Sequence, residues 1–189
     1  MVKKIFAGID EVGRGCLAGP VISCALILKR SINKKILKDS KSISFRDRIN
    51  IAKHIKKNSW YAIGAASVNE IDKYNIFNAT LLSMERAVKK LKKKPHLFLV
   101  DGTHAPKKLK NSRTVIKGDQ KIKCISAASI VAKVYRDLYM IKLGYRFPKY
   151  KWHKNFGYGT SQHLNAIKKF GVSSIHRKSY KPIHNILSK

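Results

Sequence analysis

The stretch Val21–Leu28 is an almost unbroken apolar run that follows directly on a Gly-Pro pair, and only Ser23 within it is polar. A strand with one face in water alternates apolar and polar side chains, whereas a strand covered on both faces is apolar nearly throughout. The run therefore predicts a central strand of a sheet with other elements packed on both faces.

Further candidate strands and helices alternate along the chain, without an internal repeat. Short apolar runs predict strands at residues 4–9, 61–67, 96–100 and 114–116. Apolar residues at helical spacing predict a helix that begins after the capping residue Ser44, and further helices at residues 76–91, 121–143 and 161–170. This alternation is typical of an α/β fold. We expect a main domain over residues 1–145 and a C-terminal helical and basic extension over residues 146–189 packed on it.

Size and cysteine content limit the class of protein. A chain of 189 residues with 44% hydrophobic residues can bury roughly 70% of its unfolded surface, which is enough for a core. Cys16, Cys24 and Cys124 form no Cys-x-x-Cys pair, which excludes a disulfide scaffold and a four-cysteine zinc site. The longest apolar stretch, residues 17–28, is too short to span a membrane. We expect a reduced, cytoplasmic, monomeric protein that does not enter a membrane.

The charge is strongly one-sided, with 41 Lys and Arg residues against 10 Asp and Glu residues and a formal net charge of +31. Clustered cations bind nucleic acid by releasing its counterions, so the balance favours a phosphate-rich partner. An anionic membrane surface is a weaker alternative. Because most of the basic residues are lysines spread over the whole chain, a general compositional bias explains part of the charge equally well.

The acidic residues are few, and their positions indicate chemistry. Asp10, Asp101 and Asp119 each follow an apolar run and lie near a glycine, and Glu11 adjoins the first of them. Ligand sites of open α/β sheets gather at the carboxyl ends of strands. Carboxylates brought together there repel one another unless Mg²⁺ or Mn²⁺ neutralises them, and two such ions can cleave a phosphodiester. The alternative is that each acid only satisfies a turn.

A glycine-rich turn, Gly13-Arg14-Gly15, comes directly after the first two acids. Glycine permits close approach of the backbone to a ligand, and Arg14 has the planar fork that binds phosphate. A Gly-x-Gly pattern alone is weak, and it lacks the spacing of the known nucleotide-binding loops. Its position beside candidate metal ligands is what makes it a candidate site.

Seven blocks of sequence together resemble the ribonuclease HII (type 2 ribonuclease H) family. They occur in family order over almost the whole chain, and the first and fifth are the most specific. The blocks are DEVGRGCLAGPV from Asp10, DSK from Asp39, VDG from Val100, KGD from Lys117, SAASIVAKVYRD from Ser126, GYGT from Gly157 and HR from His176. The family usually has an asparagine where this chain has Thr103, a departure that puts no identified catalytic role in doubt.

The resemblance implies a ribonuclease H-like catalytic domain, with a mixed sheet of about five strands flanked by helices. It also implies cleavage of the RNA strand of RNA–DNA hybrids, and of DNA duplexes at embedded ribonucleotides, on the 5′ side by two-metal-ion hydrolysis. The products implied are 5′-phosphate and 3′-hydroxyl ends, and the cofactor is two Mn²⁺ or Mg²⁺ ions.

The same resemblance implies roles for individual residues. The catalytic and metal-binding residues are Asp10, Glu11, Asp101 and Asp119, and the substrate-binding residues are Gly13, Arg14, Gly15, Tyr158 and Lys41. Asp137 competes for the fourth metal position, but an ion pair with Arg136 on a helix face explains it, whereas Asp119 lies at a predicted strand end. For Lys41 a solvated surface role is the stronger default, and without the resemblance Tyr158 is better explained as one more packed aromatic residue.

Two functions of other classes remain open from the residues alone. A non-catalytic basic module that binds nucleic acid explains the charge but needs no carboxylate cluster. An assembly protein that acts through its basic tail predicts that removing the residues beyond about Ser173 abolishes its activity.

Overall fold

The computed structural model describes residues 4–29, 33, 37 and 44–188. Its sheet has five strands in the order β3-β2-β1-β4-β5. β1 pairs antiparallel with β2 and parallel with β4; β2–β3 is antiparallel and β4–β5 is parallel, so the sheet is mixed. The strands are β1 (Phe6–Val12), β2 (Val21–Leu28), β3 (Ser59–Ala66), β4 (Leu97–Asp101) and β5 (Ser112–Val115).

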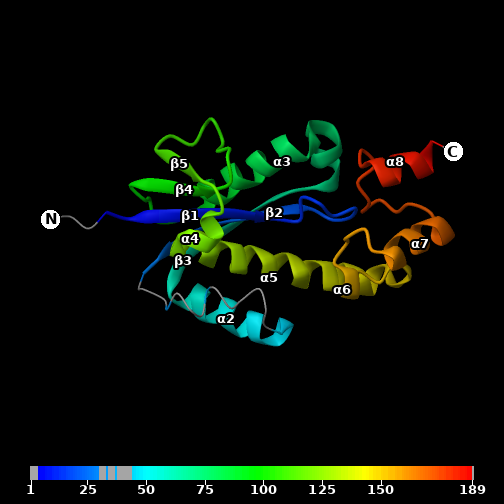
Figure 1. The fold of residues 1–189 in the computed structure, drawn as a ribbon, viewed down its shortest axis with the longest axis horizontal. Helices are drawn as coiled ribbons and strands as arrows, with labels where there is room; N and C mark the ends of the chain where they lie inside the picture. The colour runs from blue at the N-terminus through cyan, green and yellow to red at the C-terminus, as the bar shows by residue number, and fades with distance from the viewer. Residues whose placement is uncertain (1–3, 30–32, 34–36, 38–43, 189) are drawn as a thin grey trace.

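Helices cover both faces of this sheet (Figure 1). The helix α3 (Val68–Lys90) packs on one face, and α5 (Lys123–Arg146) packs on the other with α2 (Phe45–Lys57) beside it. Residues 21–27 of β2 are all buried, as the apolar run predicts for a central strand covered on both sides. The α/β architecture with a mixed five-stranded sheet is therefore confirmed.

One predicted helix start agrees with the capping interactions and another does not. Ser44 accepts a hydrogen bond from the backbone N–H of Asp47 and caps α2. Ser67 and Glu70 form a reciprocal capping box at the start of α3. This helix starts eight residues earlier than predicted, because two helical segments join across Asn75, whose φ is 65°. The predicted start at residue 76 is the start of the second segment.

Two boundaries near the acidic residues differ from the predictions. β1 does not end before Asp10: its parallel ladder with β4 stops at Ile9, but its antiparallel ladder with β2 continues to Val12. The predicted helix over residues 121–143 is two helices, a short α4 (Gly118–Lys121) and then α5. Asp119 thus lies in the first turn of a helix and not at a strand end.

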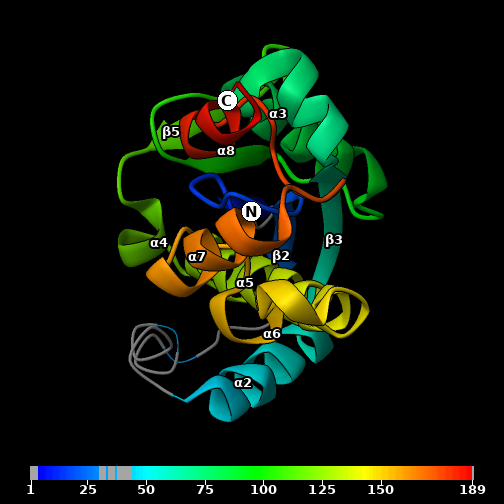
Figure 2. The same cartoon turned by 90° about the vertical axis from the view of Figure 1, so that its right-hand side faces the viewer.

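The C-terminal segment packs at one end of α5 (Figure 2). After the 3₁₀ turn η2 (Pro148–Tyr150) come α6 (Trp152–Asn155), α7 (Ser161–Phe170) and α8 (Lys181–Leu187). The sequence pattern predicted α7 but assigned α8 only to a basic tail. An apolar cluster joins this segment to Leu17, Ala18 and the end of α5, so both sides of residue 145 share a core. The division into a domain and an extension stays a prediction. Within the described residues no helix is long and apolar enough to cross a bilayer.

Candidate active site

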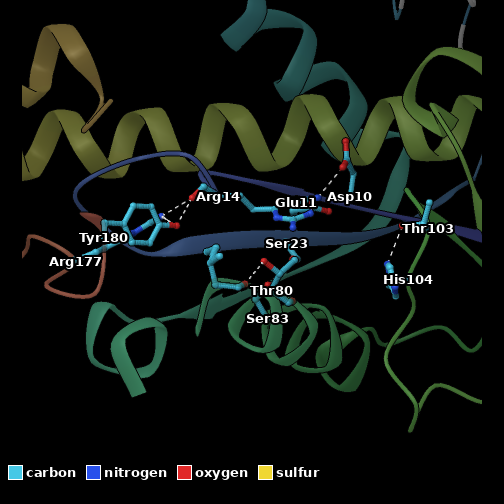
Figure 3. A network of polar contacts seen from close by, with 11 residues as sticks. Asp10, Glu11, Arg14, Ser23, Thr80, Ser83, Thr103, His104, Arg177 and Tyr180 are labelled. Carbon is cyan, nitrogen blue, oxygen red and sulfur yellow. Dashed lines mark hydrogen bonds and ion pairs between the residues drawn. The ribbon is translucent and has the colours of Figure 1, made fainter. Parts of the chain in front are cut away.

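Neighbouring strands bring three carboxylates to one edge of the sheet. Ile9 of β1 pairs with Val100 of β4, which places Asp10 and Asp101 one residue further along adjacent parallel strands. Asp10 is only 5% exposed and points toward α5, while Glu11 follows it on the same strand (Figure 3). We call Asp10, Glu11, Asp101 and Asp119 the carboxylate edge.

Asp119 reaches this edge through the backbone of α4. One oxygen of Asp101, Oδ1, accepts hydrogen bonds from the backbone N–H groups of Gly118 at 2.6 Å and Asp119 at 3.3 Å. The first turn of α4 therefore rests on the end of β4. Glu11 and Asp119 both line a cavity of about 800 Å³ over α5.

Burial and mutual repulsion raise the proton affinity of this edge. Burial raises the pKa of Asp10 well above its usual value, the charges of Glu11 and Asp101 raise it further, and a hydrogen bond from Ser129 opposes them. Burial also raises the pKa of Glu11, against the nearby Arg14 guanidinium, whose Nη1 lies 3.2 Å from Oε1. The other oxygen of Glu11, Oε2, is buried and has no hydrogen-bond partner among the described residues.

These features fit a hard divalent cation in donor chemistry. The donors are all carboxylate oxygens, which Mg²⁺ and Mn²⁺ prefer, and an orphaned buried oxygen beside repelling carboxylates is relieved by positive charge. In the described part of the chain, however, no three Asp, Glu, His or Cys side chains already stand close enough to hold one ion. The carboxylate edge therefore has the ligands but not a closed cage.

The glycine-rich turn is fixed from beneath by a buried arginine. Arg177 is fully buried and donates to the backbone oxygens of Gly13 at 2.7 Å, Arg14 at 2.9 Å and Gly19 at 2.9 Å. The hydroxyl of Tyr180 also donates to the Arg14 oxygen (Figure 3). The side chain of Arg14 itself is 51% exposed. The loop backbone is thus held while its side chain stays accessible.

A second buried arginine, Arg136 of α5, holds the rest of the same loop. It donates to the backbone oxygens of Pro20 at 3.0 Å and Ala18 at 2.9 Å, and to that of Phe156 at 2.9 Å. It also lies so close to Gly13, whose φ is 92°, that a Cβ there would come within 2.2 Å of its Nε. Neither arginine was identified from the sequence, because a surface cation is the default for this residue type. We call Arg136 and Arg177 the arginine clamp.

Tyr158 is tied to the loop by its neighbour in sequence. The oxygen of Gly157 accepts hydrogen bonds from the backbone N–H groups of Leu17 at 2.8 Å and Ala18 at 3.3 Å. The Tyr158 side chain is 38% exposed, so it is not one more packed aromatic residue, and burial of its hydroxyl raises its pKa. The structure thus brings Tyr158 and the Gly13-Arg14-Gly15 turn to one connected region.

A buried pair of histidines supports Tyr158. The Nδ1 of His163 lies 2.8 Å from the Tyr158 carbonyl oxygen, its Nε2 accepts from the indole N–H of Trp152 at 2.9 Å, and it lies 3.1 Å from Nε2 of His176. These contacts link the backbone at Tyr158 to Trp152 and to His176 of the C-terminal segment.

Two other candidate residues differ from expectation or fall outside the description. Asp137 is not on a solvated helix face with Arg136: it is 1% exposed and pairs with Lys133, whose Nζ is 2.7 Å from its Oδ1. The expected pair is wrong because Arg136 is used by backbone carbonyls. Lys41 lies outside the described residues.

Comparison with known proteins assigns the family. A family model described as Ribonuclease HII matches residues 7–183. The chain is 56% identical over 186 residues to a ribonuclease HII of Pelagibacter ubique, covering 97% of this chain and all of that protein.

Two solved structures share the fold. One is the ribonuclease H2 of Pyrococcus horikoshii OT3, with a TM-score of 0.82 at 24% identity over 97% of both chains. The other is Bst-RNase HIII, described in complex with Mn²⁺, with a TM-score of 0.73 at 15% identity over 98% of this chain and 70% of that one. The chain has a ribonuclease H-like fold and belongs to the ribonuclease HII family of metal-dependent endoribonucleases that act on RNA–DNA hybrids.

Proposed function

We propose that the protein also cuts DNA duplexes at embedded ribonucleotides, and that in both substrates it cleaves on the 5′ side of a ribonucleotide to leave 5′-phosphate and 3′-hydroxyl ends. The observation that carries the proposal is the direct continuity of the carboxylate edge with the clamped loop. Asp10 and Glu11 end the strand that leads straight into Gly13. The carboxylates proposed to act on the phosphate are thus only a few residues from the loop backbone that we propose to contact the adjoining sugar.

The four residues of the carboxylate edge would hold two Mg²⁺ or Mn²⁺ ions. When bound, such ions activate a water molecule for in-line attack and stabilise the leaving oxygen. The chain's own contribution is preorganisation: two backbone N–H groups fix one oxygen of Asp101, and burial keeps Asp10 in a low-dielectric environment. The unpartnered Oε2 of Glu11 supports the assignment, as does the Mn²⁺ complex described for Bst-RNase HIII.

Discrimination between RNA and DNA depends on the 2′-hydroxyl, because it is the group that distinguishes the two sugars. The arginine clamp occupies the carbonyl oxygens of Gly13 and Arg14, so the opposite, amide-bearing side of the turn is left for the substrate. A Cβ on Gly15 would meet no atom within 4 Å, so that side is open. Arg14 can fork onto a phosphate, and the partly exposed ring of Tyr158 can stack on a sugar.

The net charge of +31 supports binding of the duplex through its phosphates. Such contacts position the duplex but do not specify the cleavage site. We therefore expect cleavage to depend on the presence of a ribose and not on the base sequence of the duplex.

The test is cleavage of a DNA duplex with one embedded ribonucleotide, with Mg²⁺, with Mn²⁺ and with EDTA, beside Asp10→Asn and Asp119→Asn. We expect a metal-dependent cut on the 5′ side of the ribonucleotide, lost in both variants, with the new 5′ end sensitive to phosphatase. An all-DNA duplex is the matched control and should stay intact.

Each alternative has its own outcome. Activity that survives in Asp119→Asn and is lost in Asp137→Asn would move the fourth position to Asp137. Binding of the duplex without cleavage by folded wild-type protein under either metal would contradict the nuclease assignment and favour a basic binding module.

A further inference from the structure

Lys133 of α5 borders a cavity that two residues of the carboxylate edge, Glu11 and Asp119, also line. Its side chain is 30% exposed, and it lines the cavity of about 800 Å³ together with Glu11 and Asp119. The charge of an ammonium group placed beside a nuclease site acts on whatever phosphate occupies that cavity.

The ammonium group of Lys133 also lies over two aromatic rings, those of Phe156 and Tyr158. Its Nζ lies 5.1 Å from the ring centre of Phe156 and 5.8 Å from that of Tyr158, both within cation–π range. Lys133 therefore stands between the residues that act on the scissile phosphate and the tyrosine that we propose to contact a sugar. No other described lysine or arginine has cation–π contact with Tyr158.

Stability does not explain the partner of Lys133. The Asp137 carboxylate is 1% exposed, and its Oδ2 is buried without a hydrogen-bond partner, so it pays a desolvation cost that one ion pair at a partly exposed lysine offsets poorly. The order along the helix, with the base four residues before the acid, is also the less favourable one for helix stability. The buried Asp137 carboxylate, with only one of its oxygens paired, is therefore better explained by a function of Lys133 than by a contribution to stability.

We propose that Lys133, held in place by Asp137, binds a phosphate of the cleaved strand on the 3′ side of the ribonucleotide. The direction follows because the proposed cut lies on the 5′ side, and Lys133 stands toward Tyr158, which is tied to the loop proposed to read the ribose. Lys133 is the contact, and Asp137 is a positioning residue that acts through it. The inference rests on the proposed function, because it takes the scissile phosphate to lie at the carboxylate edge. It assigns this stretch of α5 to substrate binding and removes Asp137 from the candidate metal ligands.

The first experiment compares Lys133→Met and Lys133→Arg with wild type on the duplex carrying one ribonucleotide. Loss of a charge-assisted contact should lower kcat/KM about tenfold to a hundredfold in Lys133→Met, and Lys133→Arg should recover most of it. Lys142→Met is the matched control, because Lys142 is an exposed lysine of the same helix, and it should stay within about twofold.

The second experiment locates the contact. A neutral methylphosphonate replaces either the first or the second phosphate on the 3′ side of the ribonucleotide. If Lys133 binds one of them, Lys133→Met should have no further effect on that substrate and its full effect on the other. The slope of log binding constant against log salt, measured with Ca²⁺, should also fall by about one in Lys133→Met, which a merely structural change would not cause.

The third variant, Asp137→Asn, tests positioning. It should weaken substrate binding by a smaller factor than Lys133→Met, and the two changes combined should cost no more than Lys133→Met alone.

The proposal is overturned if wild type cuts the duplex and Lys133→Met stays within twofold of it. It is also overturned if the effect of Lys133→Met persists on both methylphosphonate substrates. Failure of wild type to cut at the ribonucleotide would instead overturn the proposed function. Should Lys133→Met not fold, Lys133→Gln gives the same salt-slope measurement.

Discussion

The carboxylate edge and the arginine clamp are both charged and lie on either side of the Gly13 loop, but they differ in burial and in how their charges are satisfied. Each clamp arginine is 0% exposed or nearly so and is satisfied by backbone oxygens, without a carboxylate partner. At the carboxylate edge, like charges adjoin and one oxygen has no partner. Backbone dipoles stabilise a buried guanidinium, whereas at the carboxylate edge the ion pair of Glu11 with Arg14 leaves the repulsion around Asp10, which a divalent cation would relieve. The hydrogen bonds of the clamp arginines are therefore made within the fold, whereas we expect the carboxylates of the edge to need a bound cation.

The largest expected effect is that of Asp10→Asn on the carboxylate edge. Cleavage should fall at least about a thousandfold, because a metal ligand is lost. Without metal, the Asp10→Asn variant should nevertheless melt at a higher temperature than the wild-type protein near neutral pH. The folded-state pKa of Asp10 is raised, so its favourable contribution is present at low pH and is lost as the pH rises through that pKa.

Thermal melting with EDTA and a cleavage assay check this prediction together. Asp47→Asn is the control, because Asp47 is an exposed acid in the first turn of α2, and it should leave cleavage unchanged and not raise the melting temperature. A destabilised, metal-free Asp10→Asn would mean that the edge is not under repulsion.

The next effect is on the clamp, where the buried Arg177 is compared with Arg14, an arginine outside the clamp. Arg177→Met removes the arginine donor from the backbone oxygens of Gly13 and Gly19 and one of the two donors from that of Arg14, and should lower the free energy of unfolding by about 3 kcal/mol or more. Arg14→Met removes an exposed ion pair and should cost under about 1 kcal/mol. Urea unfolding measures both, and equal losses would refute the division between the two regions.

Within the loop itself, two glycines should differ. Gly13→Ala forces a side chain into φ 92° and against Arg136, and should cost about 2 kcal/mol of stability. Gly15→Ala meets no atom, so its stability should stay within about 0.5 kcal/mol while cleavage at a ribonucleotide falls. A Gly15→Ala enzyme with full activity would contradict the proposed approach of the sugar at this glycine.

The last comparison concerns acid and the histidines beneath Tyr158. Burial lowers the pKa of His163, and burial together with the charge of His163 lowers the pKa of His176 to about 4. Both are depressed from 6.5, so their neutral network is intact above that pH and stability falls as the pH drops from 6.5 toward 4. The slope is at most about 1.4 kcal/mol per pH unit for each histidine.

Unfolding measured across this range, with His176→Gln beside wild type, should show a shallower slope in the variant. An unchanged slope would show that another group controls the acid limb.

The sequence predicted the elements that depend on local pattern. The β2 run, the Ser44 cap and the start of the second segment of α3 could be read because covered strands and helix starts carry their signal within a few residues. The bounds of β1 could not, since the strand continues past Ile9 only through its ladder with β2, a partner chosen in three dimensions. The helix α8 was missed for the same reason, because it packs a single buried side chain, Ile183, into a shared core.

For the site, the sequence by itself determined which residues are candidates for the chemistry, since the four acids, the glycine turn and the family motifs are chemically distinct wherever they fold; their roles stay predictions. Only the tertiary structure decided how they are held. Arg136 and Arg177, taken one at a time, look like ordinary surface residues in a chain with 41 Lys and Arg residues. Their roles come from burial and from partners up to 164 residues away in sequence, such as Gly13 for Arg177. A hydrogen bond of that span has no local signature, because its energy depends on removal from water, which only the folded chain provides.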